Sequence, residues 1–355
     1  MNDMTTEINF TDMVSRVKDA LAGDSASNGA TFFPTETADE IIQIVYERNF
    51  MRSLFPSMPM STRTVKVPKL NGSVGFHRQT LAQTKAGTAS DESTQTSTEV
   101  DLTLKTMIAN IPIGNYLIAY GVEGLLSVLR DDIASRLAYN EESLLINGDT
   151  ELTLADNING VYALPNNAHG INITAGTEQN DYLLNFNGLR KLAGATSVSV
   201  SGTFALSHLR SAINNLGVYA DNRAELSLIV PRNLEVQLLG MTELQTVDKY
   251  GAGATILSGE LGRIYGIRVF ATGVIPTNLN WLGKFDNTVL TKTVALLLNN
   301  RSPLIGNPTD PDRRFSMGFL DEPTKDRFVL IPRQDLAFNV RYSEAVCLMT
   351  GIATV

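Results

Sequence analysis

The chain has 355 residues and a mass of 38.6 kDa, and its 29 basic and 37 acidic residues give a net charge of −8 with histidine neutral. The length predicts two or three domains. Hydrophobic residues make up 43% of the chain, which excludes a disordered chain. Charged residues make up only 19%, which favours a surface covered by neighbouring copies. The chain shows no basic cluster, no apolar run long enough to span a bilayer and no secretory signal, which argues against a phosphate-binding, membrane-spanning or secreted protein.

The first predicted element is an amphipathic helix over residues 8–22. A small, polar linker follows it over residues 24–31. We therefore expect the helix to lie outside the main body with an unpartnered apolar stripe, although the stripe folding back onto its own domain is an open alternative. The stripe follows the helical spacing i, i+4, i+7 and i+11 and consists of Phe10, Val14, Val17 and Leu21.

A long β-arm is predicted next, after the main body begins at Phe32. Residues 63–68 and 100–104 alternate like strands. Between them, residues 80–98 hold nine Ser or Thr among nineteen positions, with Leu81 as the only large apolar side chain. Because such a segment cannot bury enough surface to pack on its own, we expect an arm that reaches out and lies on a neighbouring subunit.

The strongest helical signal runs from Val122 to Asn147, and Gly148 ends it. Its 26 residues correspond to a rod of about 39 Å, which predicts a spine for a flat molecule. The polar face of this helix is expected to be solvent-exposed and carries Arg130, Asp131, Asp132, Arg136, Glu141 and Glu142. Further helices are predicted at 183–192, 206–216 and 233–239, strands at 226–230, 266–271 and 294–298, and strands that return to the first body within 336–352.

A search for catalytic and metal-binding groups finds no constellation. The chain has no nucleophile elbow and no phosphate-binding glycine-rich loop, and its histidines, at positions 77, 169 and 208, are isolated. Cys347 lies in an apolar run and is predicted to be a buried, inert thiol. We predict no catalytic residue, metal or cofactor. An acidic stretch lacks the glycine and bidentate glutamate of a calcium loop and is predicted to be a solvated loop; it comprises Asp149, Glu151, Asp156, Asn157 and Asn159.

The order of these parts carries a family resemblance. An N-terminal arm, a helix and a polar β-arm precede a long helix ending in Asn147-Gly148-Asp149, and an α/β domain follows with Leu261-Gly262 and Ile275-Pro276. This order resembles the major capsid proteins of tailed bacteriophages, in which the long helix commonly ends in Asn-Gly-Asp or Asn-Gly-Asn. The family's later Leu-Gly-x-Pro-Val … Met-Pro phrase is altered here, since Ile267 replaces the proline and Ile275 the methionine.

The resemblance implies an α+β, Hong Kong 97-like capsid fold with an N-terminal arm, an extended β-hairpin loop, a long spine helix, and peripheral and axial domains. The implied divisions are 1–31 for the arm, 32–59 for a helix and entry to the peripheral domain, 60–112 for the extended loop, 113–200 for the peripheral domain with its spine helix, 201–335 for the axial domain and 336–355 for return strands of the peripheral domain. The implied subunit contacts are Phe10, Val14, Val17 and Leu21 in the N-terminal arm, Arg78, Lys85, Asp91 and Glu92 in the extended loop, and Asp248, Lys249 and Tyr250 in an axial loop.

The function that the resemblance implies is self-assembly, in the bacterial host cytoplasm, into pentamers and hexamers of a virion shell that encloses double-stranded DNA without sequence-specific binding. Implied partners are a portal protein and a decoration protein. Only residues 1–31 precede Phe32, so we expect a separate scaffolding protein, or none, in place of a fused segment. Some relatives link a loop lysine to an asparagine beside a glutamate, a role for which Lys85, Asn339 and Glu344 are the candidates, although their spacing does not clearly match.

Two alternatives stay open at this stage. An encapsulin, a bacterial compartment shell of the same fold that holds enzyme cargo, is generally shorter and lacks a mobile arm, so residues 8–31 argue against it. An α/β enzyme needs a buried reactive cluster, which one cysteine and three scattered histidines do not supply.

Overall fold

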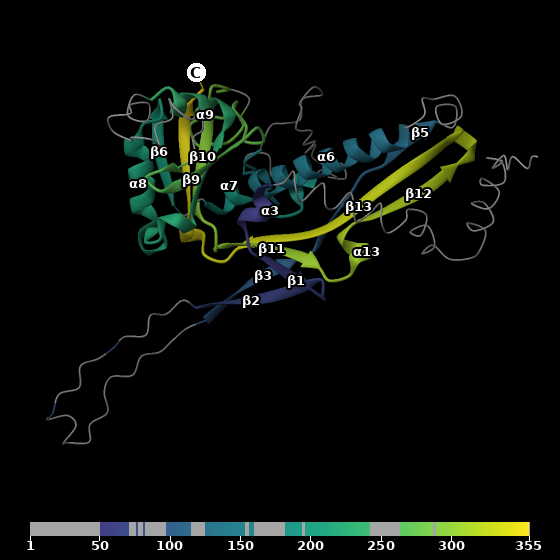
Figure 1. The fold of residues 1–355 in the computed structure, drawn as a ribbon, viewed down its shortest axis with the longest axis horizontal. Coiled ribbons are helices and arrows are strands. Elements are labelled where there is room, and N and C mark those ends of the chain that lie inside the picture. Colours follow the sequence, from purple (N-terminus) through teal and green to yellow (C-terminus); the bar gives the residue numbers. More distant parts are fainter. Residues whose placement is uncertain are drawn as a thin grey trace, which may run out of the picture.

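The computed structural model describes residues 50–70, 76, 81, 97–114, 125–152, 156–159, 182–193, 196–241, 263–286 and 289–354, with the backbone alone for 125–131. These residues form two six-stranded sheets and a separate two-stranded ribbon. In Figure 1 the two sheets follow one another along the long axis of the molecule, and the ribbon leaves the body between them. Within the described residues, no helix combines the length and the apolarity needed to cross a membrane.

One sheet, here called the elongated sheet, is organised around the long strand β13 (Arg327–Val340). β12 (Ser316–Glu322) pairs antiparallel with the first half of β13, and β11 (Pro303–Pro308) pairs with its last residues. In Figure 1 this one strand runs from the right-hand end of the molecule to its middle. The other members are β1 (Ser57–Met60), parallel to β11, and β4 (Lys105–Ile108) and β5 (Ile111–Gly114), both antiparallel to β13.

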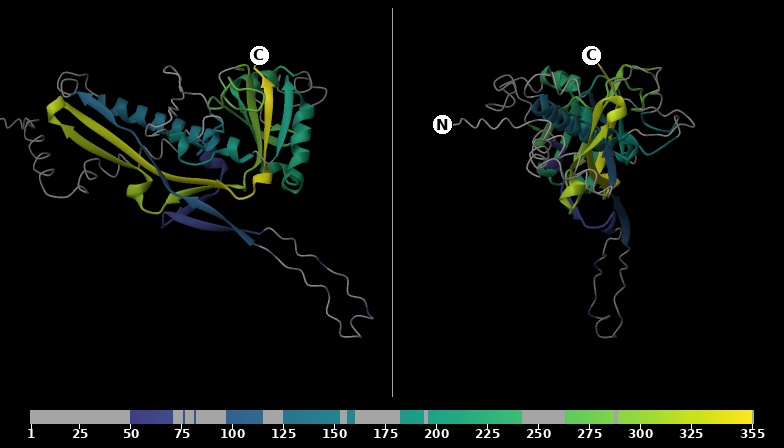
Figure 2. Two further views of the ribbon diagram at one scale, coloured as in Figure 1. Left: turned by 180° about the vertical axis from the view of Figure 1, so that it is seen from behind. Right: turned by 90° about the vertical axis from the view of Figure 1, so that its right-hand side faces the viewer.

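The long helix α6 (Leu125–Asn147) lies along the elongated sheet in Figure 1 and in the left view of Figure 2, and it confirms the predicted spine helix. Its buried Ala134 and Ala138 are small, so the helix approaches the sheet closely. They pack with Ile133 against the sheet residues Ile113, Met317 and Leu330 and against Phe315, which directly precedes β12. The elongated sheet and the spine helix thus form one two-layer body.

The second sheet, here called the compact sheet, has apolar central strands that are buried on both faces. These are β14 (Val346–Ala353), β10 (Lys292–Asn299) and β7 (Leu226–Pro231). Because side chains alternate along a strand, Leu296 of β10 faces one core cluster and Leu297 the other. The remaining strands are β6 (Ser197–Gly202), β9 (Ile267–Thr272) and the two-residue β8 (Arg263–Ile264).

Helices cover both faces of the compact sheet. On one face, α8 (Leu206–Leu216) and α9 (Arg232–Leu239) bury Leu209 and Leu234. The other face packs against the end of α6, α7 (Leu189–Leu192) and α3 (Phe50–Leu54). The predicted helices at 206–216 and 233–239 and the predicted strands at 226–230, 266–271 and 294–298 are therefore confirmed within one residue or two. Short elements complete the fold: α13 (Pro311–Arg314) and the 3-10 turns Tyr182–Leu184, Gly217–Ala220, Arg223–Glu225, Pro323–Lys325 and Ser343–Ala345.

The strand pairing corrects two expected boundaries. The hairpin was expected over 60–112, but the ribbon ends at Thr103 and residues 105–114 pair with β13 in the elongated sheet. The boundary expected between residues 335 and 336 falls inside β13, and residues 346–353 lie in the compact sheet, not in the first body. Successive side chains of β14 enter the two core clusters in turn, so both faces of the strand are buried, as expected for a central strand. The helix predicted at 8–22 lies outside the described residues.

Gly148 ends the spine helix in close contact with the following segment. Its N–H donates to the Leu144 carbonyl at 3.0 Å, and a Cβ at this position would overlap the Phe186 carbonyl oxygen. We expect Gly148→Ala to lower the free energy of unfolding by about 1–3 kcal/mol, because backbone on both sides must move. Urea denaturation checks this. Gly114→Ala is the matched control, since no atom lies within 4 Å of its added Cβ; equal losses in the two variants would contradict the packing argument.

Candidate functional site

The two-stranded ribbon projects from the body and buries little of itself; the ribbon and residues 71–96, which connect its strands, are together called the arm here. β2 (Thr64–Leu70) and β3 (Ser97–Thr103) pair antiparallel, from Thr64 opposite Thr103 to Leu70 opposite Ser97. Only Val67 and Leu102 of these strands are buried. Figure 1 and Figure 2 show both strands leading away from the spine helix. Because an isolated hairpin is marginal in water, the two strands depend on their contacts with the body.

The arm root is fixed by an apolar cluster and by hydrogen bonds. Val67 and Leu102 pack with Met60, Leu304 and Ala337 of the elongated sheet. The side-chain amide of Asn339 donates to the Asp101 carbonyl at 2.9 Å, which joins β13 to β3. The Asn339 oxygen accepts from the Val340 N–H at 2.8 Å, so both ends of this amide bond within the chain.

A second contact orients the arm towards the compact sheet. The Lys69 ammonium lies 3.7 Å from the Glu344 carboxylate and 5.2 Å from the centroid of the Tyr342 ring, in the turn between β13 and β14. The cross-strand pair Lys66–Glu99 lies at 2.5 Å but is exposed on both sides, so it contributes little. The direction of the arm is therefore set at its root.

A buried polar network joins the end of the spine helix to two loops. Arg190 of α7 is 2% exposed, and its guanidinium donates to the Asn147 side-chain oxygen at 2.8 Å and to the Gly283 carbonyl at 2.6 Å. The side-chain oxygen of Asn159 accepts, at 3.3 Å, from the Arg190 nitrogen that also donates to Asn147, and the side-chain amide of Asn159 donates to the Asn147 carbonyl at 2.6 Å. Asn147 donates in turn to the Val274 carbonyl at 3.0 Å. We call Asn147, Asn159 and Arg190 the spine joint, because they hold the helix end against residues 274 and 283.

The acidic stretch that follows the spine helix is part of this packing, and the solvated loop predicted for it is wrong. Asp149, Asn157 and Asn159 are buried. The Asp149 carboxylate accepts from the Ile158 N–H at 2.8 Å, from the Glu151 N–H at 3.0 Å and from the Lys191 ammonium at 2.9 Å. Burial of the Asp149 carboxylate is tolerated because these three donors, one of them an ammonium, replace water.

The comparison with protein families assigns the chain. Residues 29–232, more than half of the sequence, match the model of the phage capsid family. This chain belongs to the phage capsid family. A curated relative, the major capsid protein of Klebsiella oxytoca phage phiKO2, is 26% identical over 126 residues, which cover 35% of this chain and 28% of that protein. The match thus spans less than a third of the length of that relative.

Solved capsid structures share the fold over most of the chain. The capsid of a native GTA particle aligns with a TM-score of 0.55 at 14% identity, over 85% of this chain and 90% of that one. A solved structure from Microbacterium phage Oxtober96 gives 0.53 at 13% identity, over 85% and 90%. The satellite phage P4 procapsid, a particle that includes the size determination (Sid) protein, gives 0.51 at 15% identity, over 89% and 99%. The expected α+β, Hong Kong 97-like capsid fold is confirmed.

The sequence predicted a solvent-exposed polar face for the spine helix of this capsid-family chain. That prediction is wrong for part of the face. Glu141 is fully buried and forms a two-point ion pair with Arg52 of α3, at 2.5 and 2.8 Å. The same carboxylate accepts from Gln334 of β13 at 2.9 Å, and Arg52 donates to Asn307 of β11 at 2.9 Å. This cluster joins α3, the spine helix and the elongated sheet.

Glu142 beside this cluster has a raised pKa. Burial raises the pKa above the ordinary 4.5, the hydrogen bond from Thr272 lowers it, and the charge of Glu141 raises it. The folded state therefore holds the proton more tightly than the unfolded state, so stability falls as pH rises from 4.5 through the raised pKa. Glu142→Gln retains an acceptor for Thr272, and we expect it to match the parent chain near pH 4 and to exceed it at pH 8. Urea midpoints at the two pH values test this, with exposed Asp221→Asn as the control; an equal change at both pH values would contradict it.

The contact residues implied by the resemblance all lie outside the described residues: Phe10, Val14, Val17, Leu21, Arg78, Lys85, Asp91, Glu92, Asp248, Lys249 and Tyr250. The candidates for a covalent link are placed only in part, with Asn339 and Glu344 at the arm root. Cys347 is buried as predicted, and burial raises the pKa of its thiol to about 12. Sequence reasoning missed Phe76, which is 98% exposed on the arm. A large apolar residue in a polar segment was the available signal.

Proposed function

We propose that this chain is the major capsid protein of a tailed bacteriophage and that its copies assemble into an icosahedral shell around double-stranded DNA. The observation that carries the proposal is the pair of arm strands, β2 and β3, which leave the body in a fixed direction although few of their residues are buried on their own subunit. Family membership and the capsid proteins named above support the same role. A structural role in the virion, without enzymatic activity, follows from it.

Within this proposal the compact sheet corresponds to the axial domain, and the elongated sheet with α6 corresponds to the peripheral domain. The proposed partners are copies of the chain in pentamers and hexamers, a portal protein, a separate scaffolding protein and a decoration protein. The net charge of −8 suits a wall that repels packaged DNA and lets it slide. A strongly basic inner face would count against that last point. No observation favours the encapsulin alternative, because the relatives named above are phage or GTA capsid proteins.

Shortening the arm tests whether it serves assembly and not folding. Leu70 and Ser97 lie directly opposite each other, so an Asn-Gly pair in place of residues 71–96 closes the hairpin with a two-residue turn. We expect the shortened chain to retain the urea midpoint of the parent and to lose assembled particles. A large loss of stability, or particles of normal yield, would contradict this role for the arm.

A further inference from the structure

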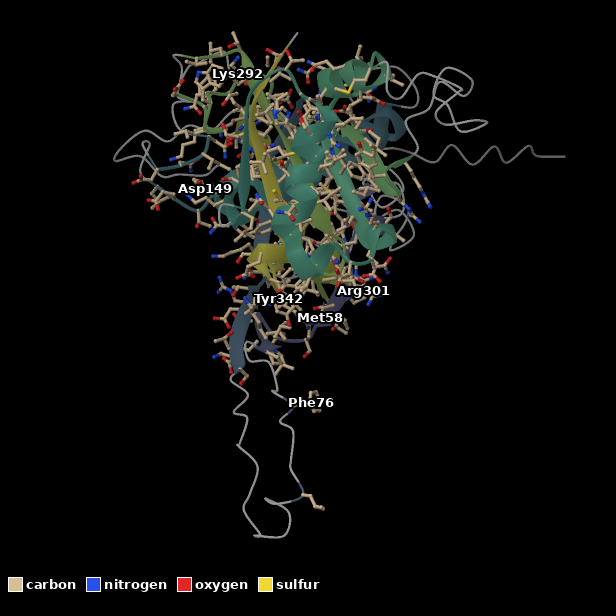
Figure 3. All side chains as sticks on the ribbon, turned by 90° about the vertical axis from the view of Figure 1, so that its left-hand side faces the viewer. Met58, Phe76, Asp149, Lys292, Arg301 and Tyr342 are labelled. Atoms are coloured by element: carbon tan, nitrogen blue, oxygen red, sulfur yellow. The ribbon has the colours of Figure 1, made fainter. Side chains whose placement is uncertain are left out.

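Two apolar features of the chain lack a partner within the part of the subunit that the structure describes. The first is on the arm, where Phe76 is 98% exposed and Leu81 is 73% exposed. Figure 3 shows Phe76 below the body, apart from the other labelled side chains. Single exposed apolar residues are common on protein surfaces, but an aromatic ring held away from the body by an arm is of the type that anchors interfaces.

The second feature is a groove between the spine helix and the start of the elongated sheet. It measures about 150 Å³, and mostly apolar atoms line it. Ile108, on one side of it, is 62% exposed. A cavity of about this volume accepts one benzene ring. Its main lining residues are Met107, Ile108 and Ile111 from β4 and β5, Ile133 and Leu137 from α6, and Pro332 from β13.

The edge of this groove is polar. Asp132 and Arg136 of α6 form an exposed ion pair at 3.7 Å and line it together with Asn140. An apolar centre within a polar rim is the usual anatomy of a protein–protein contact. Phe76 likewise stands among polar neighbours in the sequence, since His77, Arg78 and Gln79 follow it.

The direction of the arm decides which copy supplies the ring. β2 and β3 lead away from α6 in both Figure 1 and Figure 2, so the arm does not point towards the groove of its own subunit. We propose that Phe76, supported by Leu81, inserts into the groove between α6 and β4–β5 of a second copy of this chain. The contact joins two different surfaces and therefore repeats head to tail, which gives a closed ring in the pentamers and hexamers of the proposed function. It rests on the proposed function, because only an assembly brings the two copies together.

Chemical cross-linking between two variants tests this contact without altering either surface. One chain carries Gly75→Cys, next to Phe76, and the other carries Ala109→Cys, at the groove. The native Cys347 is buried and does not compete for a short bis-maleimide reagent. When the two chains are assembled together, we expect a covalent dimer on a denaturing gel. Adding Phe76→Asp to the first chain should abolish the dimer, whereas Phe76→Leu should retain it.

The controls separate this contact from the assembly as a whole. Val236→Cys, exposed on α9, should give no dimer with Gly75→Cys. Particles that form normally without the Gly75–Ala109 dimer, or with a dimer that survives Phe76→Asp, would overturn the contact and leave the capsid function standing. A dimer between Val17→Cys and Ala109→Cys would assign the groove to the N-terminal stripe and also overturn it. Failure of the parent chain to form any particle would overturn both proposals.

Discussion

Arg190→Met is expected to lower the free energy of unfolding of the unassembled subunit by about 3–5 kcal/mol. Arg190 is the donor that the oxygens of Asn147, Asn159 and Gly283 share, at 2.8, 3.3 and 2.6 Å. Removing it leaves buried acceptors without this donor at the point where the spine helix meets the compact sheet. A shorter side chain cannot restore the contacts, because the guanidinium presents its donors as a fixed fork.

Denaturation in urea measures this effect, and two further variants interpret it. Arg190→Lys keeps the charge but not the fork, so we expect an intermediate loss. Arg210→Met removes an exposed arginine from α8 and should change the free energy of unfolding by less than about 0.5 kcal/mol. If Arg190→Met were as stable as Arg210→Met, the spine joint would not hold the helix end.

The second large effect is expected at the buried ion pair of Arg52 and Glu141. Glu141→Gln and Arg52→Met each remove one charge of the pair and leave the other charge buried without its counter-ion. We expect each variant to lower the free energy of unfolding by about 3–5 kcal/mol. Replacing both with apolar residues, Arg52→Met with Glu141→Leu, removes the need to solvate either charge. We expect the double variant to lose less than the sum of the two single losses.

A double-mutant cycle on the unassembled subunit measures this coupling. The exposed pair Lys66–Glu99, at the same 2.5 Å distance, is the matched control and should show a much smaller coupling, because water screens both charges. Additive losses at Arg52 and Glu141 would contradict a direct pairing. Losses of equal size at the two pairs would contradict the argument from burial.

Local sequence patterns were sufficient to predict the helices and strands whose buried residues follow a regular spacing. The helix at 206–216 is marked by Leu206, Leu209 and Leu216, which fall on one face and are buried. The central strand β10 is marked by a continuous apolar run, as expected of a strand that is covered on both sides. The length and the end of α6 followed from its apolar face and from Gly148.

The sequence patterns failed where the burial or pairing of a residue depends on a partner far away in the sequence. Glu141 occupies a polar position of the spine helix, and its burial is explained by two distant partners, Arg52 and Gln334. Asp149 and Asn159 have the composition of a loop, but Lys191 and Arg190 satisfy them in the interior. The hairpin ends earlier than its alternation indicated, because residues 105–108 pair with β13 and not with β2. A single sequence does not reveal such pairings between distant segments.

Electron microscopy of the full chain, purified from cells that express it with and without a candidate scaffolding protein, tests the central claim most directly. The capsid function predicts closed shells, or rings of five or six subunits, in at least one of the two preparations. Particles from the chain alone would further show that no scaffold is required. Monomers alone in both preparations, from a chain that is folded by its urea transition, would contradict the account.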